Sequence, residues 1–216
     1  MPFPLIVLLL ICSVSAFGQP EATNAQQLFD DGKYAEARVL YLKLHHSEPS
    51  DALFVERLGD VDSHLANWPQ AARYYQRLTQ LRPSDAEGHY KYGGALAMQA
   101  AQANKLKALG MIGEVRACFE KAIVLNPRHV AARWALVEYY LQVPGIFGGS
   151  ESQAHKYANE LSRLSPVDHY LAKGRIEEYF GRYENAEKHY LKAHSIGNSA
   201  NTKKKLDAIR AKTKNR

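Results

Sequence analysis

Histidine is the side chain of this sequence with the widest capacity for chemistry, because an imidazole can bind a metal or transfer a proton near neutral pH. The chain has nine histidines. His45 and His46 are adjacent, so a helix would point them to different sides, and His189 and His194 are five residues apart, which fits one helical face poorly. No His pair is accompanied by cysteine ligands at the spacing of a zinc site. We therefore predict no metal and no cofactor.

Motifs for nucleophilic or phosphate chemistry are also absent from the sequence. It contains no Gly-x-Ser-x-Gly, no Walker-type phosphate loop and no His-Glu-x-x-His. Residues 145–149 are glycine-rich, but no predicted strand precedes them and no lysine follows at the position that a phosphate-binding loop requires. The sequence therefore predicts a protein without catalytic residues, and not an enzyme.

An unbroken apolar run, Leu5 to Cys12, stands near the start of the chain and is followed by small residues. Eight apolar residues are too few to span a bilayer as a helix. The pattern is typical of a signal peptide over residues 1–18, cleaved after Ala16 or Gly18. We therefore expect an exported protein, periplasmic or secreted. A retained anchor and lipid attachment at Cys12 are the alternatives.

Removal of that segment leaves Cys118 as a lone thiol without an intramolecular disulfide partner. It stands beside Phe119 in a helical pattern, so we expect a small buried apolar residue, with a reactive thiol as the alternative. The net charge of +6 is confined to one segment. Residues 201–216 hold seven basic residues and one acidic residue (7 − 1 = +6), so the rest of the chain is neutral.

The elements that position all these residues follow a period of 34 residues. Pro49 and Pro83 are 83 − 49 = 34 residues apart, and each follows a small-x-aromatic-x-x-Ala-x-x-x-Tyr-x-x-Leu pattern. The spacing recurs toward Pro127 and Pro166, and a last copy begins at Gly181. Within each copy, apolar residues three to four apart predict two helices, which the prolines end. One helix pair cannot bury its apolar faces alone, so stacking of the pairs supplies the core.

Residues 86–95 (AEGHYKYGGA), the Leu58-Gly59 pair and the recurrent period resemble the tetratricopeptide repeat, over about residues 25–198. The loop described below is similar to one in secreted bacterial repeat proteins of unassigned role. The resemblance implies an all-α, right-handed superhelical solenoid of about five helix-turn-helix repeats with a C-terminal capping helix. The array would cover residues 19–198, with repeats at 25–51, 52–85, 86–129, 130–166 and 167–198, and the basic capping helix or tail would cover 199–216.

The resemblance also implies that the first helix of each pair lines a concave groove. The residues that would point into it are Glu56, Asp60, His64, Tyr90, Met98, Trp134, Glu138, Gln142, Arg175, Glu178 and Tyr179. Aromatic rings with charges between them suit an extended peptide, because aromatic residues and arginine anchor interfaces. The alternative is that Tyr90 and Trp134 are half-buried packing residues. The Lys/Asn clamp by which some relatives hold a terminal carboxylate is absent from these positions.

Two insertions interrupt the period. The interval from Pro83 to Pro127 is 127 − 83 = 44, and the ten extra residues fall at 99–108, which are rich in helix formers. We expect longer helices there. The interval to the next proline of the pattern is 39, and the extra residues 143–149 predict a shaped loop. Its apolar pair, Ile146 and Phe147, either tucks under the stack or contacts a partner.

The basic end of the chain also allows two interpretations. Its charged residues include Lys203, Lys204, Lys205, Arg210 and Lys212. Leu206 and Ile209 could dock on the last repeat and leave the lysines outward, as a terminal repeat needs a polar outer face. Alternatively, the segment contacts an anionic membrane surface or polymer. Nucleic acid is not expected as a partner of an exported protein.

Together these features predict a non-catalytic protein–protein interaction scaffold or assembly factor of the bacterial cell envelope. It would bind a peptide or protein in its concave groove. The alternative is an envelope-surface module that uses its basic end on anionic lipid or polymer. The partner and the oligomeric state stay open.

Overall fold

The computed structural model describes residues 19–214, which fold into helices and turns, with no strand among them. Five helix pairs follow one another, and α11 (Ala200–Lys214) follows the fifth. The pairs are α1 (Gln19–Asp30) with α2 (Tyr34–Ser47), α3 (Ala52–His64) with α4 (Trp68–Leu81), α5 (Ala86–Gln102) with α6 (Lys105–Leu125), α7 (Val130–Gln142) with α8 (Glu151–Glu160), and α9 (Pro166–Tyr179) with α10 (Tyr183–Gly197). Short 3-10 helices, η1 (Gly145–Phe147) and η2 (Leu161–Arg163), flank α8. The predicted all-α solenoid is confirmed.

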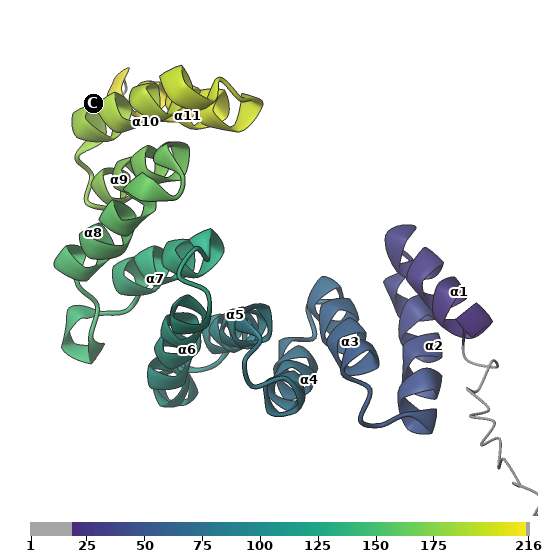
Figure 1. The fold of residues 1–216 in the computed structure, drawn as a ribbon. Coiled ribbons are helices and arrows are strands. Elements are labelled where there is room, and N and C mark those ends of the chain that lie inside the picture. The colour runs from purple at the N-terminus through teal and green to yellow at the C-terminus, as the bar shows by residue number, and fades with distance from the viewer. Residues whose placement is uncertain (1–18, 215–216) are drawn as a thin grey trace, which may run out of the picture.

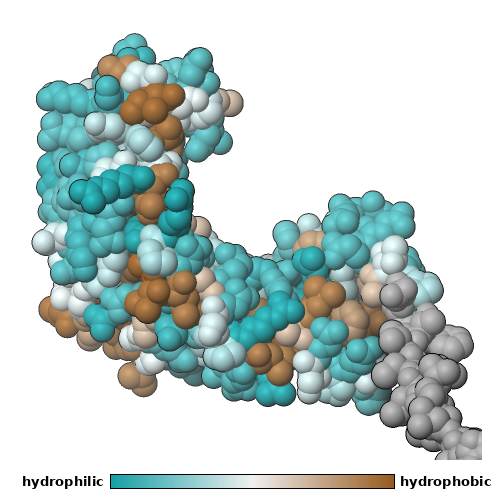
Figure 2. Space-filling view, viewed as in Figure 1, coloured by the Kyte–Doolittle hydropathy of each residue, from teal (hydrophilic) through white to brown (hydrophobic). Residues whose placement is uncertain are grey.

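The pairs stack into a crescent, with α1 and α2 at one end and α9 to α11 at the other (Figure 1). In the middle of the crescent, α3, α5 and α7 lie toward the hollow side, and α4, α6 and α8 lie on the outer side. The space-filling view shows the same hollow between the two arms (Figure 2). The first helices of these pairs therefore line the concave side.

Short polar side chains begin several helices. Asp51, Asp85 and Ser150 each accept a hydrogen bond from a backbone N–H in the first turn of α3, α5 and α8, at 2.7, 3.0 and 3.3 Å. These bonds satisfy N–H groups that have no partner inside the helix. The start of α8 after the second insertion is therefore set by local sequence.

Close contact within a pair depends on glycine opposite a ring. A Cβ added at Gly59 would lie 2.5 Å from Cε1 of Tyr75, and one added at Gly174 would lie 2.5 Å from Cδ1 of Tyr190. Both rings are buried. The same arrangement recurs at Gly93, where the added Cβ would lie 2.9 Å from Phe119. The large side chain of the second helix thus enters a gap left by the first helix.

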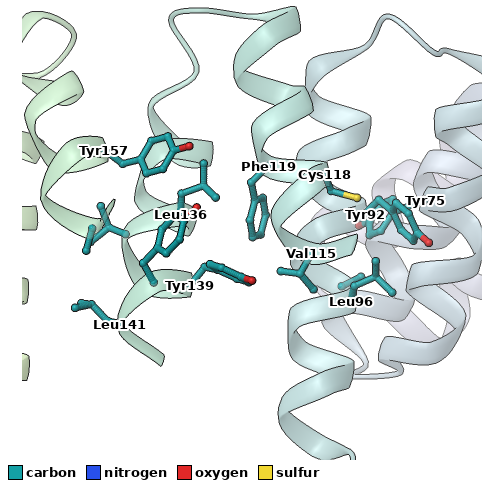
Figure 3. Packing of buried hydrophobic residues seen from close by; sticks show 14 of the residues in the cluster. Tyr75, Tyr92, Leu96, Val115, Cys118, Phe119, Leu136, Tyr139, Leu141 and Tyr157 are labelled. Carbon is teal, nitrogen blue, oxygen red and sulfur yellow. The ribbon is translucent and has the colours of Figure 1, made fainter. Parts of the chain in front are cut away.

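The largest buried cluster runs along the middle of the solenoid, and Figure 3 shows it from Tyr75 to Tyr157. Its members come from successive pairs, so each pair completes the core of the next. Cys118 belongs to this cluster and is 7% exposed. The expectation of a buried thiol is therefore confirmed.

The first insertion lengthens both helices of its pair, since α5 has 17 residues and α6 has 21, against 13 in α3 and 14 in α4. At the other end, α1 begins at Gln19, six residues before residue 25, where the first repeat was predicted to begin (25 − 19 = 6). The predicted signal peptide at 1–18 lies outside the described residues. Within 19–214, no helix combines the length and apolar character needed to cross a bilayer.

Candidate partner-binding groove

Pockets lie along the first helices at both ends of the array. One of about 480 Å³ lies between α1 and α3, and is lined by residues that include Gln26, Tyr41, Phe54 and Arg57. A neighbouring pocket of about 420 Å³ shares Arg57 and is lined by Phe29, Asp60, Ser63, His64, Trp68 and Tyr75. At the other end, a pocket of about 240 Å³ is lined by Trp134, Glu138, Asp168, Leu171, Arg175, Tyr190, Asn201 and Lys205. Five of the predicted groove residues thus line pockets.

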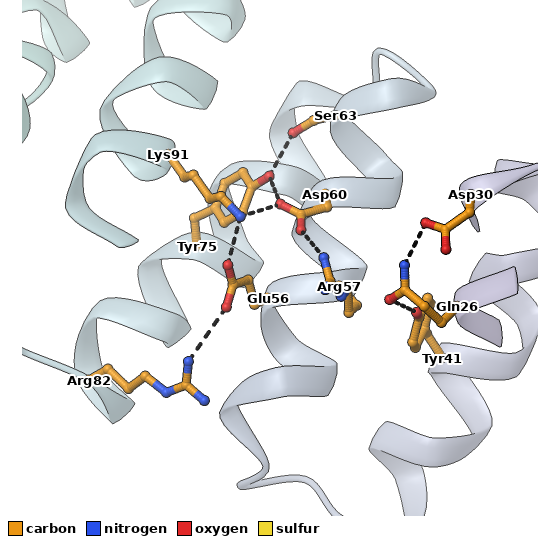
Figure 4. Close-up of polar contacts among 10 residues, drawn as sticks. All are labelled: Gln26, Asp30, Tyr41, Glu56, Arg57, Asp60, Ser63, Tyr75, Arg82 and Lys91. Atoms are coloured by element: carbon orange, nitrogen blue, oxygen red, sulfur yellow. Dashed lines mark hydrogen bonds and ion pairs between the residues drawn. The ribbon is translucent and has the colours of Figure 1, made fainter. Parts of the chain in front are cut away.

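The predicted acidic residues of α3 form ion pairs within the chain, with Lys91 of α5 and also with Arg57 and Arg82 (Figure 4). Lys91 Nζ lies 2.7 Å from Glu56 Oε1 and 2.8 Å from Asp60 Oδ1, and the Tyr75 hydroxyl donates to Asp60 at 2.8 Å. Burial alone would lower the pKa of Lys91, but the hydrogen bonds to Asp60 and Glu56 raise it. Sequence reasoning missed Lys91, although 91 − 56 = 35 places it about one period after Glu56. The network joins the first helices of two neighbouring repeats.

The same type of link joins α7 to α9. Arg175 donates to both carboxylate oxygens of Glu138, at 2.7 and 3.0 Å. Trp134 Nε1 donates to Asp168 at 2.8 Å, and the Trp134 ring packs against two core clusters. Bidentate contacts of this kind fix geometry as well as charge. These groove residues therefore stabilise the stacking of the repeats as well as lining the pocket.

The remaining predicted groove residues differ in exposure. Met98 is 44% and Tyr179 is 42% exposed, and Gln142 is exposed at the end of α7. By contrast, Tyr90 lies 5.9 Å from the Phe119 ring and 5.0 Å from the His129 ring, between centroids. Tyr90 is therefore held in packing.

His64 is stacked on Tyr34 at 4.2 Å between ring centroids. It also lies edge-on to Phe29 at 5.3 Å. This aromatic cluster ties the end of α3 to the first repeat and forms part of the 420 Å³ pocket.

The loop of the second insertion is more exposed than it would be if both of its apolar side chains packed under the stack. Ile146 is 86% exposed, so the interpretation that both apolar side chains tuck under the stack is wrong for this residue. Phe147 is 44% exposed and lies with Ile112 and Tyr139 in a small cleft beside α6. The loop turns through η1 and through Gly148 at φ +103°, a conformation that favours glycine. This turn leaves Ile146 at its outer edge.

The basic end forms α11, which caps the last repeat. Leu206 and Ile209 are 3% and 1% exposed, in a cluster with α9 and α10 residues. The docked interpretation of these two residues is therefore confirmed.

Three of the five predicted basic residues pair within the chain: Lys203 with Asp207, Arg210 with Glu187, and Lys212 with Glu178, at 2.7, 2.8 and 2.7 Å. Lys204 and Lys205 have no ion-pair partner among the described residues. Lys205 and Asn201 both line the 240 Å³ pocket. Sequence reasoning did not identify Asn201 as a site residue.

Among residues 19–214, no three His, Cys, Asp or Glu side chains are arranged to hold a metal ion. Burial, with a smaller contribution from Glu114, raises the pKa of Cys118 to about 12. A thiol with that pKa stays protonated and is a poor nucleophile.

Stacked helix pairs with glycine opposite a ring and a groove lined by the first helices define the class of tetratricopeptide-repeat proteins. The family model of the tetratricopeptide repeat matches residues 64–104. Over most of its length the array is similar in fold to solved structures of tetratricopeptide-repeat proteins.

Individual relatives show the fold and little more. TTC0263, a thermophilic TPR protein of Thermus thermophilus, superposes at a TM-score of 0.70 with 17% identity, over 90% of this chain and 99% of that one. YrrB, a TPR protein with an unusual peptide-binding site, gives a TM-score of 0.60 with 17% identity, over 88% and 91%. Protein O-mannosyl-transferase Tmtc2 of Drosophila melanogaster is 25% identical over 87 residues, which are 40% of this chain and 8% of that protein. The chain thus matches less than a tenth of that enzyme's length.

Proposed function

We propose that this chain is a non-catalytic scaffold of a bacterial cell envelope that holds an extended segment of a partner protein along its concave face. The tetratricopeptide-repeat fold supports a protein-interaction scaffold in general. The observation that carries the finer proposal is the set of pockets on the first helices at both ends of the array. Export to the envelope is supported by the sequence of residues 5–18 alone.

The middle of the inner face offers room for the partner's backbone. Gly94 of α5 follows Asp60 by one period (94 − 60 = 34), and a Cβ added there would meet no atom within 4 Å. A mid-helix glycine without a packing reason is destabilising, by about 1 kcal/mol relative to alanine. Its value is then that the backbone of a bound segment can approach α5 closely.

Recognition along this face would depend mainly on apolar side chains and hydrogen bonds. Glu56, Asp60, Glu138 and Arg175 already have intrachain partners, so a bound peptide gains little from their charge. Leu53, which is 43% exposed at one end, and the half-buried Trp134 at the other supply the apolar surface of these pockets, and large apolar side chains anchor interfaces. We therefore expect a partner segment with apolar side chains at intervals.

The test fills the groove without breaking an ion pair. Wild type and Gly94→Gln are used to capture partners from envelope extracts, with Arg77→Gln on the exposed face of α4 as the matched control. We expect Gly94→Gln to fold at least as stably as wild type, because glutamine is the better helix former. It should lose a partner that the control keeps.

A partner set that Gly94→Gln retains at wild-type affinity refutes the groove. Fractionation of cells that express the full chain tests the location separately. Recovery of the uncleaved chain in the cytoplasm refutes export.

A further inference from the structure

Two glycines of α6 have no explanation inside the molecule. Gly59, Gly93 and Gly174 each make room for a ring. Gly110 and Gly113 are exposed, and a Cβ added at either would meet no atom within 4 Å. Each weakens the helix by about 1 kcal/mol relative to alanine. A surface that keeps two such glycines is suited to close approach by something outside the chain.

These glycines belong to an apolar stripe along the outer side of α6. The stripe is made of Leu106, Gly110, Gly113, Ala117 and Val124. Their spacings of 4, 3, 4 and 7 keep them on one face of the helix. Leu106 is 81% and Val124 is 72% exposed.

The buried residues of α6 lie on the opposite side of the helix and include Val115, Cys118 and Ala122. The stripe therefore has no partner among the described residues. The outer side of α4 differs in composition, since its exposed residues include Arg73, Gln76, Arg77 and Gln80.

The loop of the second insertion lies beside this stripe. Phe147 of the 143–149 loop lies with Leu109, Ile112, Gly113, Arg116 and Tyr139 around a cleft of about 200 Å³. Hydrophobic surface is visible over this loop at the lower left of Figure 2. The loop of the second insertion thus adds Phe147 to the apolar surface of α6, and Ile146 of the same loop is also exposed.

The charges around the stripe are mostly positive. Lys105, Lys107 and Lys121 are exposed and have no ion-pair partner among the described residues. The two nearby carboxylates are engaged within the chain. Glu114 accepts from Tyr92 at 2.6 Å and Glu120 lies 4.0 Å from Arg116. The surface therefore complements an acidic partner.

We propose that the outer face of α6, from Leu106 to Val124, is a docking surface for an acidic amphipathic α-helix of a partner protein. The apolar ridge of that helix would enter the hollow at Gly110 and Gly113, because helices pack ridge into groove. Its carboxylates would face the unpaired lysines. This site is separate from the concave groove and does not depend on the function proposed above.

Other occupants fit this surface less well. A lipid surface is engaged by protruding large apolar side chains, whereas the middle of this stripe is hollow. A second copy of the chain would bring Lys107 and Lys121 toward like charges. Both remain outcomes of the test.

The test uses a displayed library of amphipathic helical peptides that carry either acidic or basic residues beside one apolar ridge. The library is selected on the whole chain and counter-selected on Gly110→Gln/Gly113→Gln. This variant should be more stable than wild type, so any loss of binding reflects the filled hollow. Arg73→Gln/Arg77→Gln on α4 is the matched control.

We expect acidic helices to be enriched and to bind Gly110→Gln/Gly113→Gln at least about tenfold more weakly than wild type, as overpacking of a close contact implies. Lys107→Glu/Lys121→Glu should reverse the preference toward basic helices. Failure to enrich any binder that depends on the two glycines overturns the proposal. So does glycine-dependent sedimentation with phosphatidylglycerol vesicles, or a glycine-dependent dimer in light scattering.

Discussion

The same substitution at two glycines should change stability in opposite directions. Gly113 lies on the open face of α6, and an added Cβ would meet no atom within 4 Å. Gly174 lies in α9, and an added Cβ would lie 2.5 Å from both Cδ1 and Cε1 of Tyr190. That ring is 1% exposed, and its hydroxyl donates to Glu178 at 2.7 Å, so it cannot move aside freely. The packing around each glycine therefore decides whether the substitution stabilises or destabilises the fold.

The magnitudes follow from helix propensity and overpacking. Gly113→Ala gains about 1 kcal/mol of helix propensity, which raises the melting temperature by about 2–4 °C in a chain of this length. Gly174→Ala gains the same propensity but overpacks the ring contact at a cost of about 1–3 kcal/mol, for a net loss of about 1 kcal/mol. The two variants should therefore differ by about 2 kcal/mol in the free energy of unfolding.

Urea denaturation followed by far-ultraviolet circular dichroism measures this difference on the chain from residue 19. Equal destabilisation by both substitutions would refute the reasoning, because it would mean that Gly113 is packed within the chain. Equal stabilisation would mean that the Tyr190 ring yields to the new methyl group.

Two further predictions concern ionisable groups. Burial raises the pKa of Cys118 to about 12. Iodoacetamide near pH 8 should therefore modify it only as fast as the protein opens, and rapidly in denaturant; fast modification of the folded chain contradicts this. Burial would raise the pKa of Glu178, but hydrogen bonds from Lys212 and Tyr190 outweigh it and lower the pKa below 4.5. The stability from this depressed pKa is present above about pH 4.5 and is lost as pH falls through the folded value. Glu178→Gln should therefore lose less stability than wild type between about pH 7 and pH 3 in urea titrations, and an equal loss argues against the linkage.

Much of the fold could be predicted from the sequence because the 34-residue period marks the helix pairs. Ala25, Gly59 and Gly93 stand 34 residues apart, and the two glycines face large rings of their second helices. The cap at Ser150 is equally local, since its side chain bonds the backbone three residues on. Features that depend on neighbours within a helix pair or within one turn of helix could therefore be predicted from the sequence.

The pairing of the groove charges could not be predicted from the sequence. Lys91 lies 35 residues from Glu56, and Arg175 lies 37 from Glu138. Such separations reflect the stacking of one repeat on the next, and the two insertions shift the period between some partners. A single sequence places Glu138 on an inward face, but it does not show whether a partner or the next repeat neutralises it.

The pairing of the inward charges indicates which groups remain available for binding a partner. Inward charges such as Glu56 and Glu138 serve the contact between repeats, and a ligand would have to compete for them. Groups without an internal role lie elsewhere: Gly94 on the hollow side, and Gly110 and Gly113 on the outer side of the lengthened α6. Because each of these glycines weakens its helix without any packing benefit, their presence is better explained by contact with something outside the chain than by architecture. Binding at both faces would let one array bring two protein segments together.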